Sequence, residues 1–182
     1  SNVDSQDISV IDTTKNEVIE TIKIKGSPVG LTVSPNAQTL YVADWFDNRV
    51  LAINTQNHQS IREVKSGSAP AGLVVSPDNQ WLYVANRDSN EIAVIDTATL
   101  KVQKSVPVGK HPFGLALSQS GQLLVSVNVQ DDTVSILDTK NFNQRVLKVG
   151  YHPYCVAISA NEQFLYVTNT QDDSVSVLDV TT

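Results

Sequence analysis

The 182-residue sequence predicts an all-β repeat protein. Three short motifs recur four times at a spacing of about 42 residues, and self-similarity at such a period is typical of repeat folds. The apolar runs are four to six residues long, rich in Val, Ile, Leu and Tyr, and end at Pro, Gly, Asn, Asp or Ser, as strands do. Helical repeats of similar length are excluded, because they require a 3.6-residue apolar periodicity that is absent here.

The first motif is built around a proline, and its four prolines step by 42, 42 and 41 residues. It reads Ser-Pro-Val-Gly-Leu at 27–31, Ala-Pro-Ala-Gly-Leu at 69–73, His-Pro-Phe-Gly-Leu at 111–115 and His-Pro-Tyr-Cys-Val at 152–156. The second motif is an apolar run ending in Asn or Asp, at 40–44, 82–86, 124–128 and 165–169. The third, at 50–54, 92–96, 134–138 and 175–179, also ends in Asn or Asp. Three motifs in the same register predict four copies of one unit.

Each unit is expected to contain four strands, A to D. In the first complete unit these are residues 30–33, 40–43, 49–53 and 60–65. Strands A and B are joined by a Ser34-Pro35-Asn36 turn, in which proline sets φ near −65° for the second turn position. Because all the connections are short, the four strands are predicted to form one antiparallel meander.

The distribution of apolar residues predicts how the units stack. Strands A and B are nearly continuous apolar runs, which indicates that both faces are covered, whereas strand D alternates as an outer strand does. Four-stranded sheets covered on both faces by their own copies describe the blades of a β-propeller. We expect a single domain over residues 1–182, with units at about 1–25, 26–67, 68–109, 110–150 and 151–182, the first and last of them partial. The expected inner-strand core residues are Leu31, Val33, Leu73, Val75, Leu115, Leu117, Val156 and Ile158.

The strand count leaves ring closure open between two alternatives. Residues 2–12 align with 169–179, so that strand C occurs once more than four complete blades require. In a closed four-bladed ring, residues 18–24 would complete the last blade and residues 7–12 would be redundant. In an open arc, the chain would be part of a larger propeller, and self-association through the exposed blade faces is expected.

The units resemble the YVTN-type β-propeller repeat. The resemblance rests on Tyr166-Val167-Thr168-Asn169, on the variants Tyr83-Val84-Ala85-Asn86 and Tyr41-Val42-Ala43-Asp44, and on the Pro-x-Gly and Ser-Pro-Asn/Asp elements before them. It implies a bacterial or archaeal protein that is exported or displayed at the cell surface, and a repeat domain that is often non-enzymatic. Members of that family commonly have seven blades.

Composition narrows the classes of partner. A formal net charge of −6 opposes binding to nucleic acids and anionic membranes. No apolar run approaches the roughly 18 residues of a membrane span, and the first residues lack the features of a signal peptide. The single cysteine, Cys155, has no disulfide partner within the chain, and its apolar neighbours predict a buried thiol.

Signals for catalytic chemistry are sparse. His111 and His152 occupy the same repeat position and could bind a transition metal or haem, but Ser27 and Ala69 fill the equivalent places in the other units. Because a metal site needs enough ligands, we interpret the histidines as loop variants and expect no cofactor. Acidic residues recur in every B-to-C loop, where turn formation explains them better than a cation site. No nucleophile motif is present.

Side chains that differ between the repeat units predict a binding surface. At the end formed by the B-to-C and D-to-A loops, the side chains that differ between units are Trp45, Phe46, Arg87, His111, Phe113, His152 and Tyr154. Aromatic residues beside Arg and His favour a contact patch, and Trp81 is expected to pack between blades. We therefore predict a non-enzymatic scaffold that binds a protein, peptide or glycan. The alternative is a lactonase-like or metal- or cofactor-dependent enzyme that uses the axial histidines and the acidic loops.

Overall fold

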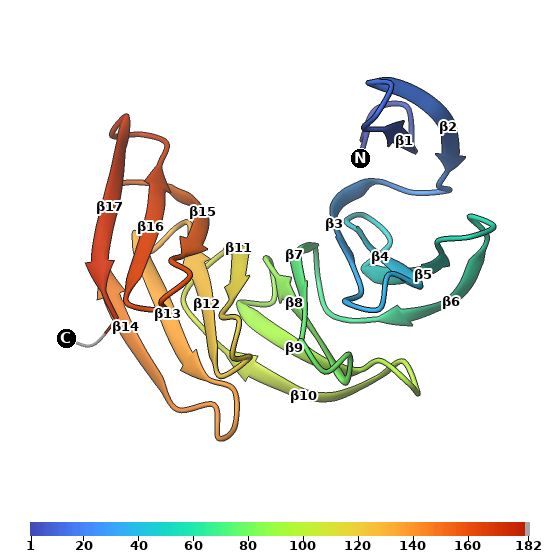
Figure 1. Ribbon diagram of the computed structural model, residues 1–182. Helices are drawn as coiled ribbons and strands as arrows, with labels where there is room; N and C mark the ends of the chain where they lie inside the picture. Colours follow the sequence, from blue (N-terminus) through green and yellow to red (C-terminus); the bar gives the residue numbers. More distant parts are fainter. Residues whose placement is uncertain (181–182) are drawn as a thin grey trace.

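The computed structural model describes residues 1–180, with only the backbone described at positions 60 and 61. Positions 181–182 of the expected domain therefore lie outside the described residues. Residues 1–180 form seventeen strands and no helix, and hence no helix that could cross a membrane. Figure 1 shows the sheets following one another along an open, curved arc.

The strands group into one hairpin and four blades. The N-terminal hairpin contains β1 (Asp7–Asp12) and β2 (Glu17–Lys23). Blade I contains β3 (Pro28–Val33), β4 (Thr39–Asp44), β5 (Arg49–Asn54) and β6 (Ser60–Lys65). Blade II contains β7 (Pro70–Val75), β8 (Trp81–Asn86), β9 (Glu91–Asp96) and β10 (Lys101–Pro107). Blade III contains β11 (Pro112–Leu117), β12 (Leu123–Asn128), β13 (Thr133–Asp138) and β14 (Gln144–Lys148). Blade IV contains β15 (Pro153–Ile158), β16 (Phe164–Asn169) and β17 (Ser174–Asp179).

Every blade is an antiparallel meander in chain order, which confirms the predicted fold class. The observed ends of the strands in blade I agree with the predicted ends to within two residues, and β6 has the predicted bounds. In the three complete blades strand C is as buried as strand B, although the sequence pattern favoured A and B. In blade II, for example, Ile92 and Ile95 of β9 have no exposed surface.

The arc is open, so the closed four-bladed ring is wrong. A closed ring would pair β2 with β17, but β2 pairs with β1, to which a short turn connects it. In Figure 1 the hairpin and blade IV lie at opposite ends of the arc.

Adjacent blades pack face to face through apolar side chains. Tyr83 and Ile92 of blade II join Leu124 and Leu137 of blade III in one buried cluster. Similar clusters join the hairpin to blade I, blade I to blade II, and blade III to blade IV. Each complete blade therefore uses one face for the preceding neighbour and the other face for the following one.

Three expected core positions are exposed at the two ends of the arc. Leu31 and Val33 are 40% and 51% exposed, because the hairpin lacks the two inner strands that a complete preceding blade would place beside β3. Cys155 is exposed because no blade covers the far face of blade IV. On that same face Tyr166 is 43% exposed, whereas its repeat equivalent Tyr83 is 2% exposed.

Truncating the inner strands tests this difference between positions. Leu73→Ala removes a side chain that is 7% exposed and packed between blades I and II, so it should lower the free energy of unfolding by about 2–5 kcal/mol. The matched change Leu31→Ala, at the exposed end, should cost about 1 kcal/mol or less. Urea unfolding followed by circular dichroism measures both values. Equal losses in the two variants would contradict the packing described.

Candidate binding surface

A bulge interrupts each inner strand near its Pro-x-Gly or Pro-x-Cys motif. In blade I the pairing shifts register between Pro28 and Leu31, and the same shift recurs in the other three blades. The residue after each proline therefore lies outside the regular ladder. These four residues are Val29, Ala71, Phe113 and Tyr154, all at the same end of their blades.

Three aromatic side chains from three blades meet at this end. We call Trp45, Phe113 and Tyr154 the aromatic cluster. The Phe113 ring centroid lies 6.1 Å from that of Trp45 and 4.2 Å from that of Tyr154. The backbone N–H of Trp45 donates to the Ser27 carbonyl at 3.0 Å, which ties the B-to-C loop of blade I to the start of β3.

Two polar side chains flank the aromatic cluster. The Arg87 guanidinium lies 5.7 Å from the Trp45 ring centroid, within the range of a cation–π contact, and pairs with Asp88 at 2.5 Å. The His152 ring is nearly parallel to that of Tyr154, at a centroid distance of 6.3 Å and an interplanar angle of 15°. A hydrogen bond of 3.0 Å between His152 Nδ1 and Thr170 Oγ1 holds its orientation.

The aromatic cluster borders a hollow of about 270 Å³. Its lining consists of Val3, Ser27, Val29, Trp45, Phe46, Phe113 and Tyr154. The Phe46 side chain is 75% exposed. Val29 is not among the residues predicted from the sequence, although it has the same repeat position as Phe113. Val3 had no signal, because it lies outside the repeated motifs.

His111 and His152 occupy a repeated turn in the left-handed region, with φ of 52° and 54°. Their backbone N–H groups donate to Asn90 Oδ1 and Asp132 Oδ1, both at 2.9 Å. Within residues 1–180, the His111 ring has no hydrogen bond or ring contact. The structure thus brings His152, but not His111, into contact with the other candidate residues.

The B-to-C acids have structural partners. Asp131 and Asp172 accept backbone N–H groups of the D-to-A turns that precede their own blades, from Lys110 at 2.8 Å and from Tyr151 at 2.6 Å. This geometry supports their interpretation as turn residues. The described part of the chain contains no group of three or more His, Cys, Asp or Glu side chains that could hold a metal ion.

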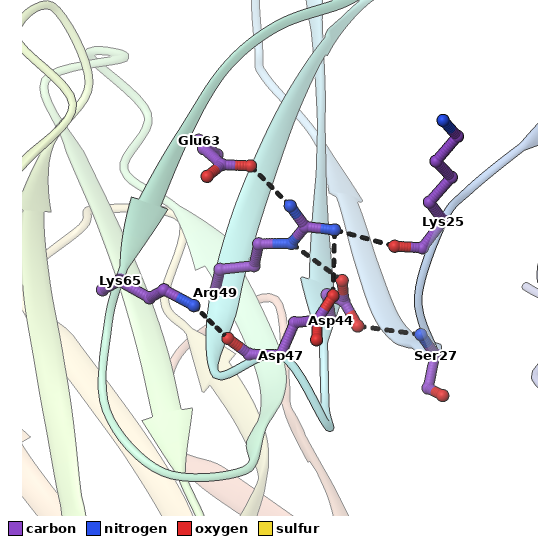
Figure 2. A network of polar contacts seen from close by, with 7 residues as sticks. All are labelled: Lys25, Ser27, Asp44, Asp47, Arg49, Glu63 and Lys65. Carbon is purple, nitrogen blue, oxygen red and sulfur yellow. Dashed lines mark hydrogen bonds and ion pairs between the residues drawn. The ribbon is translucent and has the colours of Figure 1, made fainter.

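A charged network holds the same end of blade I (Figure 2). The Asp44 side chain is fully buried and accepts the Arg49 Nε–H at 2.9 Å and the Ser27 N–H at 2.8 Å. Arg49 also pairs with Asp47 at 3.1 Å and with Glu63 at 2.6 Å. Burial opposes the charge of Arg49, but the hydrogen bonds to Asp44 and Glu63 outweigh it and raise the pKa of the guanidinium.

Neutral residues occupy the Asp44 position in the other blades. These are Asn86, Asn128 and Asn169, each hydrogen-bonded to the residue five places later. In blade III, Asn128 donates to Thr133 Oγ1 at 3.0 Å. Blade I therefore has an ion pair where the other blades have a hydrogen bond donated by a neutral asparagine.

The ion pair can be tested by exchange for its neutral equivalent. Arg49→Thr leaves the buried Asp44 carboxylate without its counter-ion, so the free energy of unfolding should fall by about 3–5 kcal/mol. The double variant Asp44→Asn/Arg49→Thr reproduces the Asn128 and Thr133 pair and should recover most of that loss. Chemical denaturation of the three proteins measures the difference. A double variant as unstable as Arg49→Thr would contradict this account.

The fold and its stacked four-stranded blades define a β-propeller, here an open arc. Residues 51–150, more than half of the chain, match the family described as "Lactonase, 7-bladed beta-propeller". The chain belongs to this lactonase family of seven-bladed β-propellers. No curated protein matches the sequence.

Two of the solved structures that share the fold illustrate the likeness. Hydrazine synthase of Kuenenia stuttgartiensis is 24% identical, with a TM-score of 0.80 over 85% of this chain and 46% of that one. The dihydro-heme d1 dehydrogenase NirN, in complex with DHE, is 18% identical, with a TM-score of 0.77 over 97% of this chain and 40% of that one. This chain therefore spans less than half the length of either, and at these identities the likeness concerns the fold alone.

Proposed function

We propose that this chain uses the end bearing the aromatic cluster as a rigid surface that binds a protein, peptide or glycan, without turnover of its own. One observation carries the proposal: Trp45, Phe113 and Tyr154, which come from three separate blades, gather around one largely apolar hollow of about 270 Å³. Large aromatic side chains in a desolvated centre, with a polar rim, are typical of binding hot spots.

The scaffold supports a preformed surface. Side-chain oxygens of Asn90 and Asp132 accept backbone N–H groups and so fix the turns before β11 and β15. The charged network of Arg49 fixes blade I at the same end. Anchors that are already ordered lose little conformational entropy on binding. Two of the B-to-C acids, Asp131 and Asp172, are occupied with backbone N–H groups. These contacts favour recognition over chemistry.

We also propose where the protein acts and which class of partner it excludes. The YVTN-like repeats support an extracytoplasmic or cell-surface protein, where recognition of proteins or glycans is useful. The net charge of −6 argues against nucleic acid as the partner.

Lactone hydrolysis is the second candidate function, and the family match favours it. Among the sequence-predicted residues, His152 is best placed for such chemistry, because its ring is oriented by Thr170 and adjoins the aromatic cluster. In this candidate, His152 would be the general base for an attacking water. The metal- or cofactor-dependent form of this alternative would use the same end of the arc.

The binding proposal can be tested with the double variant Trp45→Ala/Tyr154→Ala. Phe113 is retained, because it packs against the buried cluster between blades III and IV. On peptide and glycan arrays the wild-type protein should bind a defined set of ligands, and the variant should lose at least about tenfold in affinity for them. Tyr151→Ala is the matched control, because Tyr151 is 63% exposed and lies outside the aromatic cluster. Unchanged binding by the double variant would contradict the proposal.

A hydrolysis assay separates the two candidates. The purified protein is offered a sugar δ-lactone and an aryl ester, and acid release is followed by pH-stat. Recognition without turnover predicts no release above the buffer rate. Release that His152→Gln abolishes, while melting is unchanged, would favour the enzyme and overturn the proposal.

Self-association through the open faces stays a prediction for this chain. The far face of blade IV exposes Tyr166, Val175 and Val177, which are 43%, 57% and 61% exposed. Contact through this face should give a light-scattering mass above 19.8 kDa, and Val177→Lys should lower it. Val146→Lys, at an exposed position of β14 in the complete blade III, is the control. A mass of 19.8 kDa at all concentrations would exclude this mode.

A further inference from the structure

Two adjoining cavities open between blades II and III, at the end opposite to the aromatic cluster. Their volumes are about 440 Å³ and 300 Å³, and both are lined by Trp81, Tyr83, Thr139 and Lys140. We call them together the II–III groove. Both blades beside the groove have all four strands, so its walls do not depend on the open ends of the arc. Its size falls within the range of small-molecule pockets, about 300–1,000 Å³.

The equivalent spaces between the other blades are spanned by an arginine. Arg62 of β6 donates to the carbonyl oxygens of Ala98 and Thr97 in blade II, at 2.9 and 3.3 Å. Arg145 of β14 donates to the Val180 carbonyl beyond blade IV's last strand. In both cases the guanidinium reaches from the outer strand of one blade to the segment after strand C of the next.

Lysine replaces this arginine where the groove opens. Lys104 has the same repeat position, because it pairs with Val94 just as Arg62 pairs with Ala52 and Arg145 with Ile136. Its Nζ lies 4.6 Å from the Phe142 ring centroid rather than on the backbone of the next turn. The 440 Å³ cavity lies beside Lys104 and that turn. The groove thus coincides with the one complete interface between described blades that lacks the bridging arginine.

The lining combines aromatic surface with unpaired positive charge. Trp81 is partly buried against the cluster that joins blades II and III, and it lines both cavities. Among the described residues, neither Lys104 nor Lys140 has a carboxylate partner, although the whole chain carries a net charge of −6. Asp78 lines the 300 Å³ cavity, and its carboxylate is engaged with Ser76 Oγ at 2.5 Å and with the Gln80 N–H at 3.0 Å.

Tyr83 contributes a neutral hydroxyl to the same wall. Burial, and then the negative charge of Asp78, raise the pKa of the Tyr83 phenol. The phenol therefore stays protonated at neutral pH and adds no negative charge that would repel an anion.

We propose that the II–III groove binds a small aromatic carboxylate, with its ring against Trp81 and its carboxylate between Lys104 and Lys140. A planar ring matches the indole surface, and a carboxylate supplies the charge that both lysines lack. The groove shares no lining residue with the hollow at the other end of the arc, so the two sites can be tested independently.

Tryptophan fluorescence provides a local readout. The chain has two tryptophans, so Trp45→Phe leaves Trp81 as the single reporter. In this background, titration with benzoate should give saturable quenching, and benzamide, which has the same ring without the charge, should bind at least about tenfold more weakly. Lys104→Arg should restore the bridge seen at Arg62 and weaken benzoate binding at least about tenfold. Lys101→Arg, on the same strand and outside the lining, should leave binding unchanged.

Folding of each variant is checked by its urea midpoint, so that a loss of binding is not a loss of structure. The proposal is overturned if benzoate and benzamide bind equally, or if Lys104→Arg binds benzoate as the parent does. It is also overturned if benzoate fails to quench at millimolar concentration, or if glucuronate binds and benzoate does not. The last result would assign the groove to acidic sugars.

Discussion

The structure depends on the contact between blade faces, because strands B and C are apolar on both sides. Val84 and Ala93 of blade II are buried against blade I, while Tyr83 and Ile92 of the same strands are buried against blade III. A single blade could cover neither set by itself. Stacking therefore supplies the hydrophobic stabilisation that no blade has alone, and a blade side without a neighbour exposes apolar residues.

The arc also requires the inner strands of adjacent blades to lie close together, and glycine permits this close approach. A Cβ atom at Gly72 would fall on the Phe113 carbonyl oxygen, and one at Gly114 on that of Tyr154. The equivalent residue in blade IV is Cys155, which is exposed because no further inner strand approaches it. This close approach places the ring centroids of Phe113 and Tyr154 4.2 Å apart. The candidate binding surface is thus a product of the same packing that builds the arc.

The backbone contacts of the turns repeat from blade to blade, whereas the side chains of the turns vary. The D-to-A turns are held by an Asn or Asp of the preceding blade, as at Ala69, His111 and His152, whose N–H groups each donate at 2.9 Å. Because this bond uses only the backbone of the turn, the side chain there is free to differ between units. The same holds between blades, where Lys104 stands at the repeat position of the bridging arginines and lines a groove.

The sequence by itself determined the strands, their order and the end of the blades at which the variable residues lie, because these follow from local periodicity and from the repeat register. On that basis Trp45, Phe113 and Tyr154 were predicted to share one end. Only the tertiary structure decided which faces are covered: it exposed Leu31, Val33 and Cys155, separated β2 from β17, and added Val3 to the hollow. An apolar pattern shows that a face needs a neighbour, but the neighbour that covers it is set by contacts between residues a whole blade or more apart in the sequence, and no local pattern records them.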